Sequence, residues 1–185
     1  MDKKLIKVLC YLYVFFMAFL AVIYYVNGET FKASVAAAGI LCGAIPLLLP
    51  LIHISFNGPL TICYILFLTA SQYLGSVRGW YHLGWWDSFL HGLSGILLGF
   101  MGIALYERLV QRDAGKHISP WFVFLFTFSF AVFGGVLWEV YEFTSDQLFG
   151  MTLQGGGNKD TMTDLITDSL GGLAAGTWAG IRSRR

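Results

Sequence analysis

Three short motifs in this 185-residue chain concentrate the side chains that can do chemistry. The first joins an aspartate to a histidine, and the other two contain only acids. Their members are Asp87, His91, Glu139, Glu142, Asp146, Asp160, Asp164 and Asp168, which include seven of the chain's eleven acidic residues. No Lys or Arg lies within the motifs. So many carboxylates can lie close together only with a cation or with shared protons. A divalent metal ion is the simplest partner.

The spacing within each motif is three or four residues, so on a helix the members of a motif share one face. One imidazole with several carboxylates suits Mg²⁺, Mn²⁺ or Ca²⁺, and a histidine with two carboxylates also suits Zn²⁺. A buried glutamate beside such an ion can serve as a general base. We therefore assign Asp87, His91, Glu139 and Asp164 as metal ligands and Glu142 as the general base.

The other motif acids have open roles. Asp168 lies one turn deeper in an apolar run than Asp164, and it is a ligand, a group that orients His91, or a protonated packing group. Asp160 precedes the same run, where it either joins the site or caps the following helix. Asp146 either joins the site or is a solvated loop acid.

Two further candidates lie outside the motifs. His82 is within an aromatic segment on the same expected side of the membrane, and Arg78 could bind an anionic head group. The segment 143–159 contains three consecutive glycines, Gly155 to Gly157. Such a segment is either a flap over the site or a plain flexible connector.

The composition indicates which elements must position these residues. The chain is 56% hydrophobic and 12% charged, with a mean hydropathy of +0.65. Soluble domains carry about 25% charged residues, so these values predict an integral membrane protein. A net charge of +1 gives no reason to expect a nucleic-acid partner. We predict one all-α domain over residues 1–185, a bundle of six transmembrane helices. The expected spans are 5–26, 33–54, 59–74, 87–106, 120–141 and 161–181.

Basic residues predict how the bundle is oriented. With the N-terminus inside, nine Lys and Arg residues fall in inner segments and three in outer segments. The inner set is Lys3, Lys4, Lys7, Arg108, Arg112, Lys116, Arg182, Arg184 and Arg185, and the outer set is Lys32, Arg78 and Lys159. This bias places both termini in the cytoplasm. The start of span 87–106, the end of span 120–141 and the start of span 161–181 then share the outer face, so the site is expected to face outside.

Each motif continues along its helix as a row of small residues. The rows are Gly95 and Gly99 after His91, Gly135 and Ala131 before Glu139, and Gly172, Gly176 and Gly180 after Asp168. Small residues at this spacing allow membrane helices to approach closely. The rows predict that the last three spans pack together and bring the motifs to one place.

The three motifs resemble those of the YjdF-like family of small bacterial inner-membrane proteins, a domain of unknown function. The matching stretches are Trp86-Asp87 through His91-Gly92, Trp138-Glu139 through Glu142-Phe143, and Asp160 to Asp164 running into Gly171-Gly172. The resemblance covers roughly residues 60 to 181 and supports Asp87, His91, Glu139, Glu142, Asp160 and Asp164. Asp168 matches only part of the family, and Trp85-Trp86 stand where some relatives carry an extra histidine. A looser similarity to VanZ-like membrane proteins is also present. The resemblance implies a multi-pass protein of the bacterial inner or plasma membrane, without an established reaction.

Three functions are compatible with these residues. The first is a metal-dependent hydrolase or transferase that acts on a lipid or lipid-linked substrate at the outer face, with membrane lipid as its partner. The second is a proton or divalent-cation transporter, because acids at membrane depth mark ion pathways. Against it, residues 96–104 and 123–132 are almost wholly apolar. The third is a non-catalytic membrane partner with a structural metal site. The sequence does not decide the oligomeric state.

Overall fold

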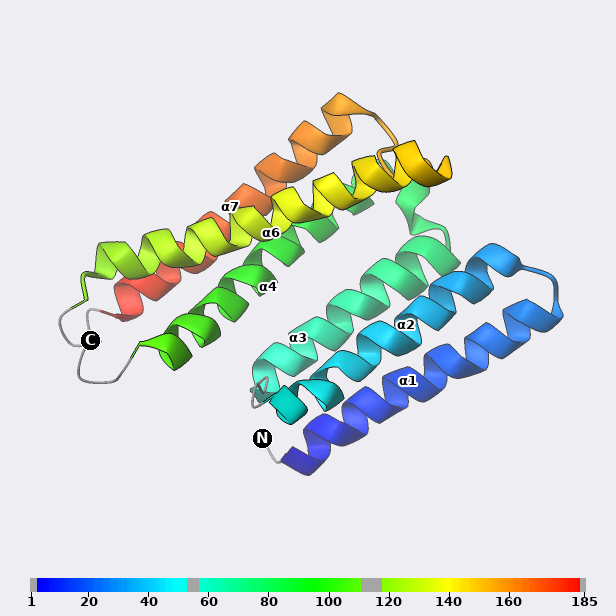
Figure 1. The fold of residues 1–185 in the computed structure, drawn as a ribbon, viewed down its shortest axis with the longest axis horizontal. Coiled ribbons are helices and arrows are strands. Elements are labelled where there is room, and N and C mark those ends of the chain that lie inside the picture. The colour runs from blue at the N-terminus through cyan, green and yellow to red at the C-terminus, as the bar shows by residue number, and fades with distance from the viewer. Residues whose placement is uncertain (1–2, 53–56, 111–117, 184–185) are drawn as a thin grey trace. The chain divides into compact units, whose positions relative to one another are not determined.

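The computed structural model describes residues 3–52, 57–110 and 118–183 (Figure 1). All regular secondary structure in these ranges is helical, which confirms the predicted all-α class. Of the basic residues behind the predicted orientation, Arg112, Lys116, Arg184 and Arg185 lie outside the described ranges. The chain divides into two compact units, residues 1–86 and 87–185, and each is described by itself.

The first unit contains three long helical segments. Helix α1 covers Lys3–Val26 and α2 covers Thr30–Leu48, followed by the short 3-10 helix η1, Leu49–Ile52. Helix α3, Gly58–Leu68, continues as the π-helix η2, Thr69–Val77, and the 3-10 helix η3 covers Trp80–His82. The α-helical part of α2 ends before Pro50, earlier than the predicted span, because proline cannot donate the next helical hydrogen bond. The third segment runs beyond its predicted end at residue 74.

The core of the first unit is shared by α1, α2 and α3. Cys10, Tyr13 and Met17 lie on one face of this helix and pack with buried residues that include Ile65 of α3. The hydroxyl of Tyr13 donates a hydrogen bond of 2.7 Å to Oε1 of Gln72 in η2. The side-chain oxygen of Gln72, close to the predicted end of the third span at residue 74, therefore has its hydrogen-bond partner inside its own unit.

The second unit consists of α4, Trp86–Leu109, α6, Pro120–Phe149, and α7, Asn158–Arg182. Pro120 opens α6 after Ser119, whose hydroxyl oxygen accepts a hydrogen bond from the backbone N–H of Trp121. Helix α6 ends at Gly150, which has a φ of 61°. This end lies about two turns beyond residue 141, where the predicted span ends, so Asp146 belongs to the helix. The three helices alternate in direction, which places the start of α4, the end of α6 and the start of α7 at one end (Figure 1).

Glycines allow α4 and α7 to lie backbone against backbone. A Cβ atom on Gly95 would collide with the carbonyl oxygen of Asp168. A Cβ atom on Gly171 would collide with the carbonyl oxygen of Gly92. Backbone atoms cannot turn aside as a flexible side chain can, so both positions require glycine. The predicted close approach of these two helices is confirmed, and Gly171, which was outside the predicted row, takes part in it.

The predicted glycine row of α7 faces α6 instead. A Cβ atom on Gly172 would lie 2.8 Å from the Cβ of Ala131, and one on Gly176 would lie 3.1 Å from the carbonyl oxygen of Phe124. Adjacent glycines at 171 and 172 therefore serve two different neighbours. This arrangement lets α7 pack tightly against α4 and α6 at the same depth.

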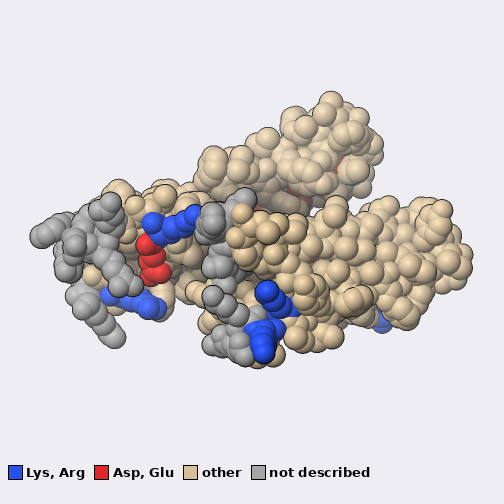
Figure 2. Space-filling view, turned by 60° about the horizontal axis from the view of Figure 1, so that its bottom comes forward, with Lys and Arg blue, Asp and Glu red and all other residues tan. Residues whose placement is uncertain are grey.

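Five of the described helical segments are long and apolar enough to cross a membrane. They are Lys4–Val26, Thr30–Leu51, Gly58–Val77, Trp86–Leu109 and Pro120–Phe149. Helix α7 contains the sixth predicted span but carries three aspartates and four glycines, which lower its hydropathy. Figure 2 shows that uncharged side chains cover most of the visible surface of the described residues.

Candidate functional site

The three motifs form one polar layer inside the second unit. Four acids and the histidine of this layer are buried, namely His91, Glu139, Glu142, Asp164 and Asp168. The Asp87 side chain is 33% exposed and lies at the edge of the layer. Helix α4 supplies the histidine, and α6 and α7 supply two buried carboxylates each. The sequence-based expectation that the motifs meet is therefore met by the geometry.

Asp168 fixes the orientation of His91. Its Oδ2 lies 2.9 Å from Nδ1 of His91, and its Oδ1 accepts a hydrogen bond from the hydroxyl of Ser94. The carboxylate fits against α6 because Gly135 is opposite; a Cβ there would lie 2.6 Å from Oδ2. Of the three roles left open for Asp168, this contact matches the one in which it orients the imidazole. Metal-binding histidines almost always have such a partner on their second nitrogen.

The other nitrogen of His91 faces two carboxylates. Its Nε2 lies 3.9 Å from Oδ1 of Asp87 and 4.0 Å from Oδ2 of Asp164. The second oxygen of Asp164, Oδ1, accepts a hydrogen bond of 3.1 Å from Ser88. Oδ2 of Asp164 is buried and has no hydrogen-bond partner in the described part of the chain. An ionised Asp168 can only accept, so Nδ1 donates to it and a neutral imidazole keeps its lone pair on Nε2.

These three side chains are arranged as a small cation site would require. One ligand atom from each of Asp87, His91 and Asp164 lies within 4.8 Å of the other two. An ion with ligand bonds of about 2.1 Å holds neighbouring ligand atoms roughly 3.0 to 3.4 Å apart. The two separations from Nε2 of His91, 3.9 and 4.0 Å, would need to close by about 0.5 to 1 Å to reach that range. The separation between the two carboxylates, at most 4.8 Å, would need to close by up to about 1.4 Å to reach its upper end. The ion pairs of the site acids within the described chain all involve His91, so the negative charge exceeds the positive charge there.

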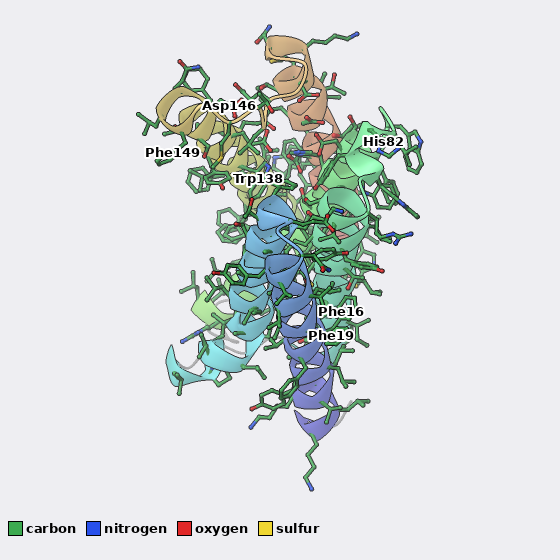
Figure 3. All side chains as sticks on the ribbon, turned by 90° about the vertical axis from the view of Figure 1, so that its right-hand side faces the viewer. Phe16, Phe19, His82, Trp138, Asp146 and Phe149 are labelled. Carbon is green, nitrogen blue, oxygen red and sulfur yellow. The ribbon has the colours of Figure 1, made fainter. Side chains whose placement is uncertain are left out.

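The two glutamates of α6 differ in their surroundings. Oε1 of Glu142 accepts a 2.8 Å hydrogen bond from the indole N–H of Trp138, which is one of the residues labelled in Figure 3. Glu139 is 5% exposed, and among the described residues only the side chain of Thr161 offers it a hydrogen bond, so at least one of its carboxylate oxygens has no partner. It is not part of the three-residue group described above. Instead, Glu139 lines a cavity of about 440 Å³ between α6, α7 and the segment that connects them.

The remaining motif acids have structural surroundings of their own. The carboxylate of Asp146, labelled in Figure 3, accepts hydrogen bonds from the backbone N–H groups of Leu153 at 2.7 Å and Gln154 at 3.0 Å. It therefore fixes the segment between α6 and α7 to the end of α6. Asp160 lies in the first turn of α7, and a Cβ added to Gly156 would lie 3.2 Å from the Cβ of Asp160. Its place suits the positive end of the helix dipole.

Arg78 and His82 belong to the first unit. Both are exposed, and His82 ends η3, as Figure 3 shows. Their predicted participation in the site stays a prediction.

Three polar contacts of the site were not foreseen from the sequence. Ser88 and Ser94 donate to aspartates of α7, and Trp138 donates to Glu142. Each follows or precedes a motif residue by one to four positions, so it projects from the same region of the helix. This spacing was the available signal, and searching only for ionisable groups overlooked it.

The apolar helices and their buried polar layer define a multi-pass membrane protein. The chain belongs to the family described as "Predicted membrane protein (DUF2238)", whose match covers residues 8–185. It is also similar to an uncharacterized protein of Thermotoga maritima, with 34% identity over 111 residues. That alignment covers 57% of this chain and 56% of the relative, so the chain spans just over half of the protein it matches. No solved structure matches the chain.

Proposed function

We propose that this protein is a metal-dependent hydrolase or transferase that acts on a lipid or lipid-linked substrate at the outer face of the membrane. The observation that carries the proposal is the convergence of Asp87, His91 Nε2 and Asp164 beside a histidine held by Asp168. Family membership supports the membrane location, and the likeness to YjdF-like proteins is in line with it. Neither assigns a reaction, so the proposal depends on the site alone.

The donor set indicates what the site would hold. One imidazole nitrogen and two carboxylates are hard or intermediate ligands, suited to Mg²⁺, Mn²⁺, Ca²⁺ or Zn²⁺. An ion held by three side chains keeps further positions for water or substrate. A bound ion can activate water and polarise a phosphoryl or acyl oxygen. It would also balance the charge of the acids, whose ion pairs in the described chain all involve His91 and no Lys or Arg.

Glu142 is the proposed general base. It is buried, it is fixed by Trp138, and it interacts electrostatically with Asp87 and His91. Its Oε1 is the acceptor of the indole hydrogen bond, so Oε2 is the oxygen that would accept a proton from water. Its role differs from that of the ligands, because removing it should stop turnover without removing the ion.

The outer face follows from the basic residues. Nine Lys and Arg residues fall in the inner segments of the predicted topology and three in the outer segments. The site end of the second unit lies among the outer segments in this topology. A site at the lipid–water boundary meets lipid head groups and lipid-linked phosphates first.

The metal part of the proposal is tested by thermal unfolding of the full-length protein in detergent. Each of the four ions is compared with chelator, for wild type, Asp164→Asn and the control Asp146→Asn. We expect at least one ion to raise the midpoint of wild type and of the control but not of Asp164→Asn. Equal shifts in all three proteins, or none in wild type, would contradict the site.

The catalytic part is tested in vesicles of total bacterial lipid that contain the protein and the stabilising ion. Mass spectrometry of the lipids should show a product that depends on the ion and is absent with Glu142→Gln. Glu142→Gln should still be stabilised by the ion. An unchanged lipid profile with wild type would refute the enzyme and leave the structural-metal or transport alternatives.

A further inference from the structure

The cavity beside Glu139 lies at the end of the second unit that contains the polar layer. Val136, Val140 and Phe143 of α6 form one wall, and Leu165 of α7 lies on the other side. Gln154, Asn158 and Thr161 line its remaining part. Its volume of about 440 Å³ is within the range of about 300 to 1,000 Å³ that ligand sites have.

The polar and apolar linings occupy different depths. Gln154, Asn158 and Thr161 lie at the start of α7 or just before it, at the same end as the polar layer. Val136 and Leu165 lie deeper along their helices. From residue 136 to residue 143 a helix rises roughly 10 Å, about a third of the hydrocarbon core of a bilayer. The cavity therefore matches the head group and the first part of the chain of a lipid.

The polar rim is ordered by internal hydrogen bonds. Asp146 holds the backbone of Gln154, and the side-chain amide of Gln154 donates a 2.6 Å hydrogen bond to Thr161. These contacts hold the connecting segment against α7 beside Glu139. The cavity is thus lined by residues whose positions are fixed before a ligand arrives, which lowers the entropy cost of binding.

Glu139 supplies the independent observation that points to a ligand. Its side chain is more than nine-tenths buried and lines the cavity. Within the described chain only the side chain of Thr161 offers it a hydrogen bond, which leaves at least one carboxylate oxygen without a partner. Buried polar groups in proteins are nearly always paired, and an unpaired carboxylate is especially costly. Five charged groups interact with it, four acids and a single histidine, namely Asp87, Glu142, Asp164, Asp168 and His91. Its missing partner is therefore a cationic hydrogen-bond donor.

We infer that this cavity binds a phospholipid whose head group carries a primary amine, with the ammonium group at Glu139 and an acyl chain along Val136 and Leu165. The inference rests on the proposed function in one respect, because it names the lipid that the metal site would act on. It adds a substrate-binding role for Glu139, separate from the three side chains that converge on the ion.

The experiment is native mass spectrometry of the detergent-purified full-length protein with dioleoyl phosphatidylethanolamine or dioleoyl phosphatidylcholine, in chelator. The two lipids share their chains and their net charge, but the choline head group has no N–H donor. Because hydrogen bonds to charged groups are stronger than those between neutral groups, wild type should retain the ethanolamine lipid about tenfold better than the choline lipid. Glu139→Gln should bring this ratio close to one.

A second pair of variants tests the apolar wall. Val136→Trp should lower retention of both lipids because the indole fills the cavity. Leu137→Trp is the matched control, since Leu137 is 52% exposed and does not line the cavity. It should retain both lipids as wild type does. This pair also tests the cavity if Glu139→Gln does not fold.

Equal retention of the two lipids by wild type, or an undiminished preference in Glu139→Gln, would overturn the inference. Equal effects of the two tryptophan variants would overturn it as well. Because chelator is present, these results do not depend on the metal. Loss of the lipid preference with an intact metal shift would refute the inference alone, and an intact preference without a metal shift would refute the proposed function alone.

Discussion

Replacing Asp168 by asparagine should weaken metal binding without removing a metal ligand. The isosteric change keeps the shape of the buried side chain, which lies 2.9 Å from Nδ1 of His91. It removes the negative charge that makes the imidazole a better ligand and that fixes which nitrogen carries the proton. The proposal therefore predicts an effect at the ion, although Asp168 itself lies on the opposite side of the imidazole.

The size of the effect can be worked out from linkage. Loss of a carboxylate partner behind a metal-binding histidine costs about 10- to 100-fold in metal affinity. At an ion concentration of 100 times the wild-type dissociation constant, the wild-type protein gains about 2.7 kcal/mol. The same concentration would stabilise Asp168→Asn by only about 0.4 to 1.4 kcal/mol. With about 2 to 4 °C per kcal/mol, the metal-induced rise in midpoint should fall from about 5–11 °C to about 1–6 °C.

Thermal unfolding in detergent over a series of ion concentrations measures this change. Asp146→Asn is the matched control, because Asp146 makes hydrogen bonds to the backbone and is not among the three converging residues. It should keep the wild-type metal shift even if its own midpoint without metal is lower. A full metal shift in Asp168→Asn would refute the argument that this carboxylate acts on the ion through His91.

Three further predictions concern packing, topology and the connecting segment. Gly95→Leu should lower the midpoint by at least about 4 °C because its Cβ meets a backbone carbonyl, whereas Gly84→Leu, with open space around it, should change it little; equal effects would contradict the close packing. Gly156→Cys should react with an impermeant thiol reagent on intact cells, and reaction only after permeabilisation would reverse the proposed orientation. Asp146→Ala should speed amide hydrogen exchange at Leu153, because the Asp146 carboxylate accepts a hydrogen bond from this N–H in the wild-type protein. Unchanged exchange would show that this hydrogen bond does not hold the connecting segment.

Much of the site geometry could be predicted because two simple regularities combine. Spacings of three and four residues place the motif side chains on one face of each helix. Alternating direction then brings the start of α4, the end of α6 and the start of α7 together, as the contact between His91 and Asp168 shows. These two regularities are sufficient to predict that the motif residues form a polar layer at one end of the helices, without knowledge of the packing.

The details that depend on helix rotation could not be predicted. Gly171 contacts α4 whereas Gly172 contacts α6, and the sequence alone does not distinguish which of two adjacent glycines faces which neighbour. Glu139 lines the cavity and Glu142 binds an indole, although both have the same residue type and similar apolar surroundings in sequence. Small rotations of α6 decide between these positions, and they result from the packing of all three helices.

The ends of the helices were also difficult to predict. Helix α6 continues to Phe149 because backbone hydrogen bonding and capping at Gly150 extend it past the strongly apolar run. Hydropathy reports where lipid ends, whereas helices end where their backbone groups find other partners. The two extra turns include Asp146. Its carboxylate therefore accepts the hydrogen bonds of Leu153 and Gln154 from a position within the helix.

Metal stoichiometry tests the central claim most directly. The detergent-purified protein is equilibrated with Mn²⁺ by dialysis, and bound metal is measured by elemental analysis beside Asp87→Asn, Asp164→Asn and the control Asp146→Asn. We predict close to one Mn²⁺ per chain for wild type and the control, and a large loss in both ligand variants. Equal binding by wild type and the two ligand variants, or no binding by wild type to this ion or to Mg²⁺, Ca²⁺ and Zn²⁺ in parallel dialyses, would contradict the claim that Asp87, His91 and Asp164 form a metal site.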